Sequence, residues 1–316
     1  MEVLSHSDLV GLGLSPEEVQ RQARRGELVR LCRGVYTKRD HLPAEVEKRH
    51  RLWVLAHARN TDYAVSHVSA AVLHGLPVGG ADLREVHVTR IGHGGQRHQA
   101  GRRVHSSPLD PQWCTVVDGV LVTTVARTVA DLLKVESQEV AVSAADAALN
   151  LKLCTREQLN EALAELKFHP GGPRARRAMA LVDGRSESPG ETRARLVLDA
   201  GPLPKTELQI SIFDEYGRPV GRADGGYPKK GVFWEYDGMG KYDVLLEPGQ
   251  TTLDAILGEK KRESDITELG STMLRIDKYD LRSPARLWDR ALRALARAEI
   301  PGWLAPRGRY EVAPRI

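Results

Sequence analysis

The first forty residues carry an apolar and polar pattern that predicts a helix followed by a β-hairpin. Ser15 can accept the Glu18 amide, and a proline lies between them, so a helix is expected to start here and to run to about Arg25. Residues 28–37 then form two short apolar runs about a tight turn. With a short helix expected at about 7–12, this order predicts a winged helix-turn-helix module.

The pattern from residue 43 to residue 170 predicts a mixed α/β segment. Apolar residues recur every three or four positions over 43–60, as they do on the core-facing side of a helix. Strands are expected at 85–91 and 102–105, with a hairpin at Asp118-Gly119. Further helices are expected at 66–74 and from Val125, Gln138 and Thr155.

The pattern after Ser188 changes to a strand-rich order, and this predicts a separate domain. The Pro/Gly run 169–173 breaks the preceding helix, so the linker is expected between it and Ser188. Helices are predicted at 189–200, 252–269 and 284–298, with strands at 207–213, 219–224, 232–236 and 273–276.

A chain of 316 residues is long enough for several cores. The predicted class is therefore α/β (α+β multidomain), with a winged helix at 1–60, a mixed middle domain at 61–170 and a third domain at 188–300.

The bulk composition fits a folded protein that stays in the cytoplasm. Lys plus Arg exceed Asp plus Glu by only 46 − 42 = 4, which is too little to indicate a nucleic-acid partner by itself. No apolar run approaches the roughly 18 residues of a membrane span, and no signal peptide is recognisable. The three cysteines are far apart and do not have the spacing of a zinc site.

Basic residues are concentrated in the predicted winged helix. Residues 21–39 contain seven of them and a single acidic residue. Such a density attracts phosphates, with the helix residues in or beside a major groove and the wing residues along the backbone. A solvated basic face of a protein-binding module is the alternative. The DNA-binding candidates are Arg21, Arg24, Arg25, Arg30, Arg33 and Lys38.

The same segment contains three characteristic motifs, which are Leu12-Gly13-Leu14-Ser15, Arg25-Gly26-Glu27-Leu28-Val29-Arg30 and Arg33-Gly34-Val35-Tyr36. With these motifs it resembles the N-terminal winged helix of AbiEi-type antitoxins over about forty residues. A following stretch, which includes Ser66-His67 and Leu73-His74-Gly75-Leu76-Pro77, is similar to one that accompanies this domain in many actinobacterial proteins. The resemblance implies DNA binding and transcriptional autoregulation.

The middle segment is rich in histidines, which raise a metal or proton-transfer hypothesis. Their spacing matches no common ligand pattern such as H-E-x-x-H, so we interpret them as packing or surface residues. These histidines are His67, His74, His87, His93, His98 and His105.

Carboxylates at the ends of two predicted neighbouring strands suggest a metal site in the third domain. Asp224 ends one strand, and Glu235 and Asp237 lie two residues apart at the end of the next. Oxygen ligands of this kind suit Mg²⁺ or Mn²⁺, which could activate water for phosphodiester hydrolysis. Glu191 is a further candidate ligand, and Lys241 or Lys260 would supply the cation that stabilises the developing charge.

Each of these acids also has a structural interpretation. Glu191 stands three residues after Ser188, so its role could be solely that of a capping-box glutamate. Asp237 precedes a glycine and could only serve a turn. Asp224 and Glu235 could be structural, although an unpaired charge in the apolar strand of Glu235 would be costly.

The third domain contains several further motifs in order, which are Ser188-Pro189-Gly190-Glu191, Gly221-Arg222-Ala223-Asp224, Glu235-Tyr236-Asp237-Gly238 and Glu259-Lys260-Lys261-Arg262-Glu263, with Leu269-Gly270 and Leu274-Arg275. With these motifs it resembles the DUF559 group of proteins related to very-short-patch repair endonucleases, in the PD-(D/E)XK superfamily. The resemblance implies a restriction-endonuclease-like core with a divalent metal. One departure is that the superfamily's E-x-K is Glu235-x-Asp237 here, so that either Lys241 or Lys260 supplies the lysine or the domain has lost catalysis.

Two classes of function follow from the sequence. The first is a Mg²⁺- or Mn²⁺-dependent endonuclease that acts on double-stranded DNA in repair, restriction or phage defence. The second is a non-catalytic antitoxin-like repressor, which would have a toxin partner encoded elsewhere and could act as a homodimer.

Overall fold

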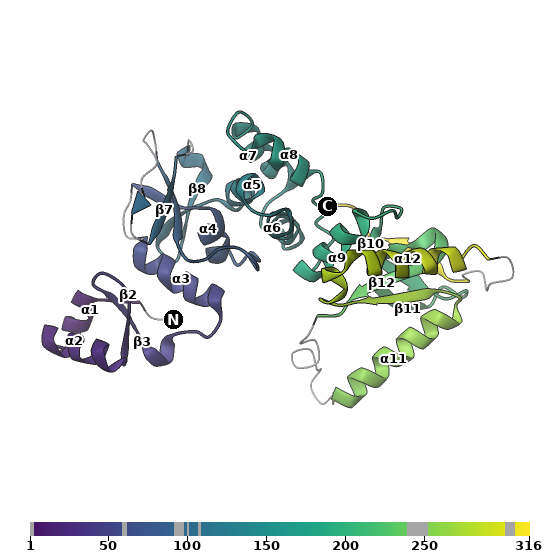
Figure 1. The fold of residues 1–316 in the computed structure, drawn as a ribbon, viewed down its shortest axis with the longest axis horizontal. Helices are drawn as coiled ribbons and strands as arrows, with labels where there is room; N and C mark the ends of the chain where they lie inside the picture. Colours follow the sequence, from purple (N-terminus) through teal and green to yellow (C-terminus); the bar gives the residue numbers. More distant parts are fainter. Residues whose placement is uncertain are drawn as a thin grey trace. The chain divides into compact units, whose positions relative to one another are not determined.

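The computed structural model describes residues 3–58, 62–91, 98–99, 101–106, 109–238, 252–300 and 307–316. The chain divides into an N-terminal unit, Met1–Ala148 with Lys152–Ala180, and a C-terminal unit, Leu149–Leu151 with Leu181–Ile316 (Figure 1). Helices and three sheets make up these units, which confirms the predicted mixed α/β class. No helix among the described residues is long and apolar enough to cross a membrane.

The chain begins with the expected helices and hairpin, together with a short strand that was not predicted. Ser15 accepts the Glu18 amide at 3.2 Å, and Gly26 ends the helix in the left-handed conformation, at φ 74°. The strand order in the sheet is β1-β3-β2. The elements are β1 (Leu4–Ser5), α1 (His6–Gly11), α2 (Pro16–Arg25), β2 (Leu28–Cys32) and β3 (Val35–Lys38).

Helix α3 (Val46–His57) packs against this N-terminal module and against the second sheet. Its residue Leu52 lies in a core cluster with Leu31 and Val35 of the hairpin. Two residues further on, Val54 belongs to the core of the second sheet. Because one helix contributes to both cores, the module and the second sheet form one compact unit.

The second sheet has the order β6-β7-β5-β4-β9-β8, with parallel pairing of β4 with β9 and of β5 with β7. Asp118 and Gly119, at φ 50° and 73°, make the predicted hairpin turn. The strands are β4 (Tyr63–Val65), β5 (Val86–Arg90), β6 (His98–Gln99), β7 (Arg102–His105), β8 (Cys114–Val117) and β9 (Val120–Thr123). The helices are α4 (His67–Leu73), α5 (Val125–Val135), α6 (Gln138–Asn150), α7 (Arg156–Glu165) and α8 (Gly172–Met179).

Helix α8 was not predicted, because the run 169–173 was interpreted only as a break. Proline cannot continue a helix but suits its first turn, and α8 starts with Pro173 in that position.

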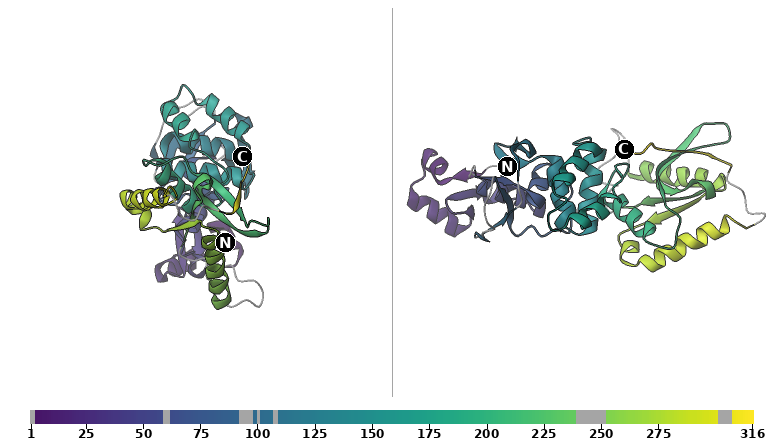
Figure 2. Two further views of the ribbon diagram at one scale, coloured as in Figure 1. Left: turned by 90° about the vertical axis from the view of Figure 1, so that its right-hand side faces the viewer. Right: turned by 90° about the horizontal axis from the view of Figure 1, so that it is seen from above.

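The C-terminal unit is a five-stranded sheet with helices on both faces (Figures 1 and 2). The order is β13-β12-β11-β10-β14, with β12 and β13 parallel. Trp234 packs on the face of α9 and α12, and Phe233 packs with Ile266 of α11 on the other. The elements are α9 (Pro189–Asp199), β10 (Glu207–Phe213), β11 (Pro219–Tyr227), β12 (Val232–Tyr236), α11 (Thr252–Glu268), β13 (Thr272–Ile276), α12 (Pro284–Arg297) and β14 (Arg309–Val312).

Strand β10 contains a backbone irregularity at Gln209, whose φ is 50°. Leu208 packs into the core on one face of the sheet, whereas Ile210, two residues on, packs into the core on the other. In a regular strand these two side chains would share a face. The irregularity at Gln209 therefore changes the face on which the following side chains of β10 lie. The same residue contacts Glu191 of α9.

Candidate functional site

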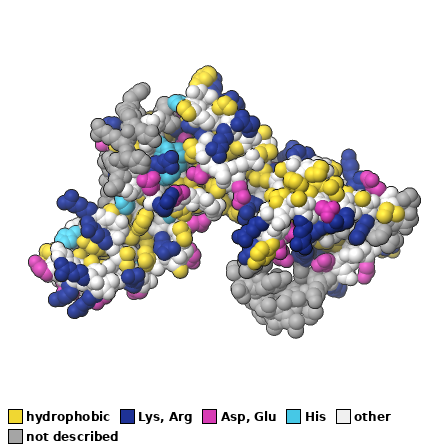
Figure 3. Space-filling view, in the orientation of Figure 1, with side chains coloured by type: hydrophobic (Ala, Val, Ile, Leu, Met, Phe, Trp, Pro, Cys, Tyr) yellow, Lys and Arg dark blue, Asp and Glu magenta, His cyan; other side chains and the backbone are white. Residues whose placement is uncertain are grey.

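A surface rich in arginine covers α2 and the β2–β3 hairpin. Arg21, Arg24 and Arg25 are exposed and are neighbours on α2, since they are three and four positions apart. Dark-blue side chains gather at this end of the N-terminal unit in Figure 3. The basic surface, as we define it, consists of the exposed residues Arg21, Arg24, Arg25, Arg30, Arg33 and Lys38.

The basic surface is only weakly engaged within the protein. Arg21 pairs with Glu18 on the same helix, and Arg25 Nη1 lies 4.0 Å from Glu27 Oε1. Arg30 Nε donates to the Cys32 carbonyl at 3.3 Å. Exposed ion pairs of this kind contribute about 0–1 kcal/mol, so a phosphate could replace them at little cost.

Glu191 of α9 is buried at the start of its helix and accepts three hydrogen bonds. The donors are the Glu187 amide at 2.9 Å, Ser188 Oγ at 2.8 Å and Gln209 Nε2 at 2.9 Å. Burial, and then the negative charge of Asp224, raise the pKa of Glu191 to about 7. The residue thus takes part in the capping contacts and also lies within electrostatic reach of a second carboxylate.

Glu235 of β12 is buried and held by two arginines. Arg262 Nη2 of α11 lies 2.5 Å from its Oε1, and Arg275 Nη1 of β13 lies 2.6 Å from its Oε2. Both carboxylate oxygens are therefore engaged by guanidinium groups. The sequence around Glu235 shows no partner for its charge in this apolar strand. The structure supplies two partners, which lie 27 and 40 positions further along the chain.

The other predicted site residues are more dispersed. Asp224 Oδ2 accepts the backbone amide of Tyr236 at 2.8 Å, and Asp237 is half-buried just beyond β12. Lys241 lies outside the described residues, and Lys260 lies on α11 but its side chain is not described.

The described carboxylates do not gather into the cluster of three acids that the sequence predicted. No three of Glu191, Asp224, Glu235 and Asp237 bring carboxylate oxygens together at ligand distances, and Glu235 is already neutralised. The Mg²⁺ or Mn²⁺ cofactor therefore stays a prediction.

We expect an NMR titration of the Glu191 carboxyl carbon to have its midpoint near pH 7 rather than near 4.5. A carboxyl whose folded-state pKa is raised stabilises the fold below its unfolded pKa, and this contribution is lost as the pH rises through 7. The C-terminal unit should therefore lose stability between about pH 4.5 and 7 through this group. A midpoint below pH 5 would contradict the assignment.

Glu235→Ala is expected to destabilise the C-terminal unit by about 3 kcal/mol, because it leaves Arg262 and Arg275 without their buried counterion. Urea unfolding followed by hydrogen exchange in β12 would measure the loss. Glu263→Ala is the matched control, since Glu263 is only half-buried and also pairs with Arg275, at 3.3 Å. Equal effects of the two substitutions would refute a structural role specific to Glu235.

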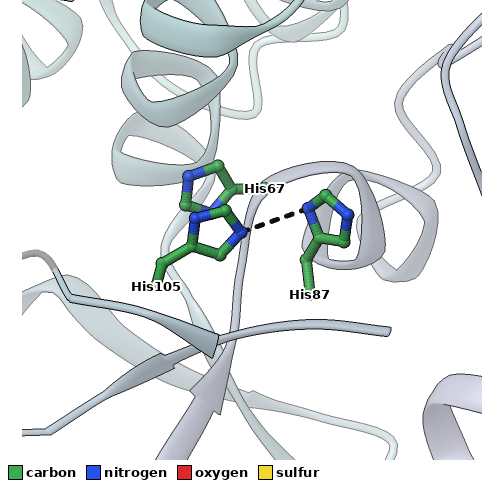
Figure 4. Close-up of side chains that lie close together, drawn as sticks. All are labelled: His67, His87 and His105. Atoms are coloured by element: carbon green, nitrogen blue, oxygen red, sulfur yellow. Dashed lines mark hydrogen bonds between the residues drawn. The ribbon is translucent and has the colours of Figure 1, made fainter. Parts of the chain in front are cut away.

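Three histidines that the sequence did not single out as ligands lie together in the N-terminal unit (Figure 4). His67 and His87 are buried and His105 is half-buried, and one nitrogen of each lies within 4.8 Å of the others. The rings of His67 and His105 stack, with centroids 3.6 Å apart. Parallel pairing of β5 with β7 brings His87 and His105 together, and such pairing is not visible in local spacing. Figure 4 draws the contact between His105 Nε2 and His87 Nδ1, at 3.3 Å.

The remaining histidines of that segment behave differently. His74 Nε2 lies 2.7 Å from the Thr123 carbonyl, outside the cluster. His93 lies outside the described residues, and of His98 only the backbone is described.

Comparison with known proteins gives a family match at the N-terminus and two relatives over a longer span. The relatives are the uncharacterized proteins MT2308 and Rv2248 of Mycobacterium tuberculosis (strains CDC 1551 / Oshkosh and ATCC 25618 / H37Rv). Each is 33% identical over 187 residues, which cover 59% of this chain. The chain spans 66% of the length of these relatives. Residues 2–37, which contain most of the basic surface, match the family described as "Transcriptional regulator, AbiEi antitoxin".

Proposed function

We propose that this chain is a DNA-binding transcriptional regulator of the antitoxin type that contacts duplex DNA through its N-terminal module. The basic surface carries the proposal, because it places six exposed cationic side chains on a helix and an adjoining hairpin. The family match of residues 2–37 supports the same role.

The geometry of the module suggests how each part would contact DNA. Helix α2 follows α1 as the second helix of a helix-turn-helix, which is the element that enters a major groove. Arg24 and Arg25 lie in its last turn, and Arg30 and Arg33 lie on the hairpin beside it. In this proposal the arginines of α2 contact the major groove, and those of the hairpin contact the phosphate backbone.

A toxin partner and a homodimer belong to the same proposal. Antitoxin-type regulators act together with a second protein, and two copies of a helix-turn-helix read two half-sites about one DNA turn apart. Co-expression with the product of the neighbouring gene, followed by size exclusion, would test for such a partner.

Footprinting of the full chain over the DNA upstream of its own gene, with EDTA present, tests the main proposal. We expect protection of one or two segments on one side of the duplex at about 50 mM salt. Absence of protection at that salt concentration, where phosphate contacts are strongest, would reject the proposal.

A second candidate is phosphodiester hydrolysis by the C-terminal unit. The buried Glu191, with its raised pKa and its proximity to Asp224, favours it, as does the buried Gln209 Oε1, which has no hydrogen-bond partner among the described atoms. The two arginines on Glu235 favour the regulator instead.

Incubation of supercoiled plasmid with Mg²⁺ or Mn²⁺ distinguishes the two candidate functions. Cleavage by the wild type that Glu191→Gln abolishes would support hydrolysis, and intact plasmid would eliminate it.

A further inference from the structure

The three-histidine cluster has the ligand type and separation of a transition-metal site. Imidazole nitrogens bind Zn²⁺ at about 2.0–2.1 Å, so two ligands at a tetrahedral angle lie about 3.3 Å apart. His105 Nε2 and His87 Nδ1 are 3.3 Å apart. All three ligand nitrogens lie within 4.8 Å of one another. Because the rings of His67 and His105 stack at an interplanar angle of 13°, one of these two side chains must also rotate to point its lone pair at a shared ion.

A neighbouring hydroxyl group hydrogen-bonds one ring nitrogen of His67. In metal sites, such a hydrogen bond to the nitrogen that does not bind the metal orients the histidine. His67 Nδ1 lies 2.9 Å from Ser66 Oγ, which also accepts the Thr89 hydroxyl at 2.8 Å. In the tautomer that donates from Nδ1 to Ser66 Oγ, the lone pair of His67 lies on Nε2. Metal-bound histidines commonly donate their second N–H in this way.

The backbone at His67 is held in an uncommon conformation. Its φ is 53°, in the left-handed region, at the first residue of α4. For a residue with a side chain this conformation costs on the order of 1–3 kcal/mol, and such outliers concentrate at functional sites. The strained backbone therefore belongs to His67, the residue whose ring stacks on that of His105.

The surroundings of the cluster favour neutral rings. Burial is the main cause that lowers the pKa of His87 to about 4 and that of His67 well below its ordinary value. Neutral imidazole is the form that binds metal. Arg127 is paired with Asp131 at 3.2 Å, so this buried pair adds little net charge. Lys134 and Arg103 contribute positive charge, so moderate rather than extreme affinity is expected.

We propose that His67, His87 and His105 bind a transition-metal dication of the zinc class, with a fourth position left for water or another ligand. Three histidines with an open position are a known ligand set for zinc, and imidazole also suits Cu, Ni and Fe. The site lies in the N-terminal unit, whereas the predicted Mg²⁺ or Mn²⁺ site lies in the C-terminal unit. None of its three ligands belongs to the basic surface, so the proposal does not depend on the proposed DNA contacts.

Calorimetric titration of Zn²⁺ into the untagged full chain, after dialysis against a chelator, tests this site. We expect about one equivalent to bind with a Kd of about 10 μM or tighter. Co²⁺ should show the visible absorption of a four-coordinate site, and Zn²⁺ should displace it. Absence of saturable binding at 100 μM Zn²⁺, on the order of ten times that Kd, would overturn the proposal.

Single substitutions His67→Gln, His87→Gln and His105→Ala should each weaken Zn²⁺ binding at least about tenfold and abolish the Co²⁺ band. Ser66→Ala should weaken binding by about 10- to 100-fold, because it removes the partner that orients His67. His74→Ala is the matched control, since His74 is also half-buried in this unit but lies outside the cluster.

Circular dichroism would check that each variant folds. His105→Ala keeps the test decisive if a more buried variant does not fold, because His105 is the half-buried member. One equivalent of Zn²⁺ bound with unchanged affinity by His105→Ala would place the metal elsewhere and overturn the proposal.

Discussion

Alanine at both Arg24 and Arg25 is expected to weaken binding of the full chain to duplex DNA by about 10- to 30-fold at 0.15 M salt. Each arginine that neutralises a phosphate releases counterions, and this contributes roughly 1 kcal/mol at that salt concentration. Both side chains are exposed in the last turn of α2, so their removal leaves the core of the module unchanged. The slope of log affinity against log salt should fall by about 1.8, twice the 0.9 expected for one phosphate. Fluorescence anisotropy with a labelled duplex measures both quantities.

The matched control is alanine at both Arg176 and Arg177. These are also adjacent exposed arginines in the last turn of a helix, α8, of the same unit. The control changes the net charge by the same amount, so a general electrostatic effect would weaken both double variants alike. The proposal predicts that the α8 variant keeps affinity within about twofold. Equal losses in the two variants would contradict a DNA contact specific to α2.

Asp131→Ala is expected to destabilise the N-terminal unit by about 3–5 kcal/mol. Its partner Arg127 is fully buried on α5, with Nε 3.2 Å from Asp131 Oδ2. Burial raises the pKa of Asp131 despite that arginine, so the pair is expensive to desolvate. Removal of the carboxylate leaves a buried guanidinium without its counterion, which costs more than the pair contributes. Urea unfolding followed by hydrogen exchange in α5 reports on this unit alone.

A double-mutant cycle separates the lost ion pair from lost packing. Arg127→Met combined with Asp131→Ala removes both charges, so the double variant should be more stable than the sum of the two single losses predicts. The coupling free energy should be on the order of 1–3 kcal/mol. Additive losses, or a loss below about 1 kcal/mol for Asp131→Ala alone, would show that the pair is not a critical element of α5.

The N-terminal module could be predicted closely because its signals are local. Ser15, Pro16 and Gly26 fix the ends of α2 within the helix itself, and the structure places them in those roles. Short strands such as β1 and β14 have no such signal. Their two to four residues become strands only through pairing with β3 and β10, from distant parts of the chain.

The chemistry of the C-terminal unit could be predicted less well, because it depends on partners far away in the sequence. An E-x-D motif beside an aspartate suggested a metal site, but nothing near Glu235 in the sequence indicated Arg262 or Arg275. Helix α11 and the parallel pairing of β12 with β13 bring these arginines to the carboxylate. The gathering of His67, His87 and His105 could not be predicted from local spacing for the same reason, since β5 and β7 pair although β6 lies between them in the chain.

The salt dependence of DNA affinity in the wild-type chain tests the central claim most directly. The six side chains of the basic surface predict a slope of log affinity against log salt of about −4 to −5, if most of them contact phosphates. The measurement needs only the full chain, a labelled duplex and salt concentrations from about 50 to 200 mM. A slope in that range is the predicted result. A slope near zero, or no binding at the lowest salt, would contradict recognition of DNA by this surface.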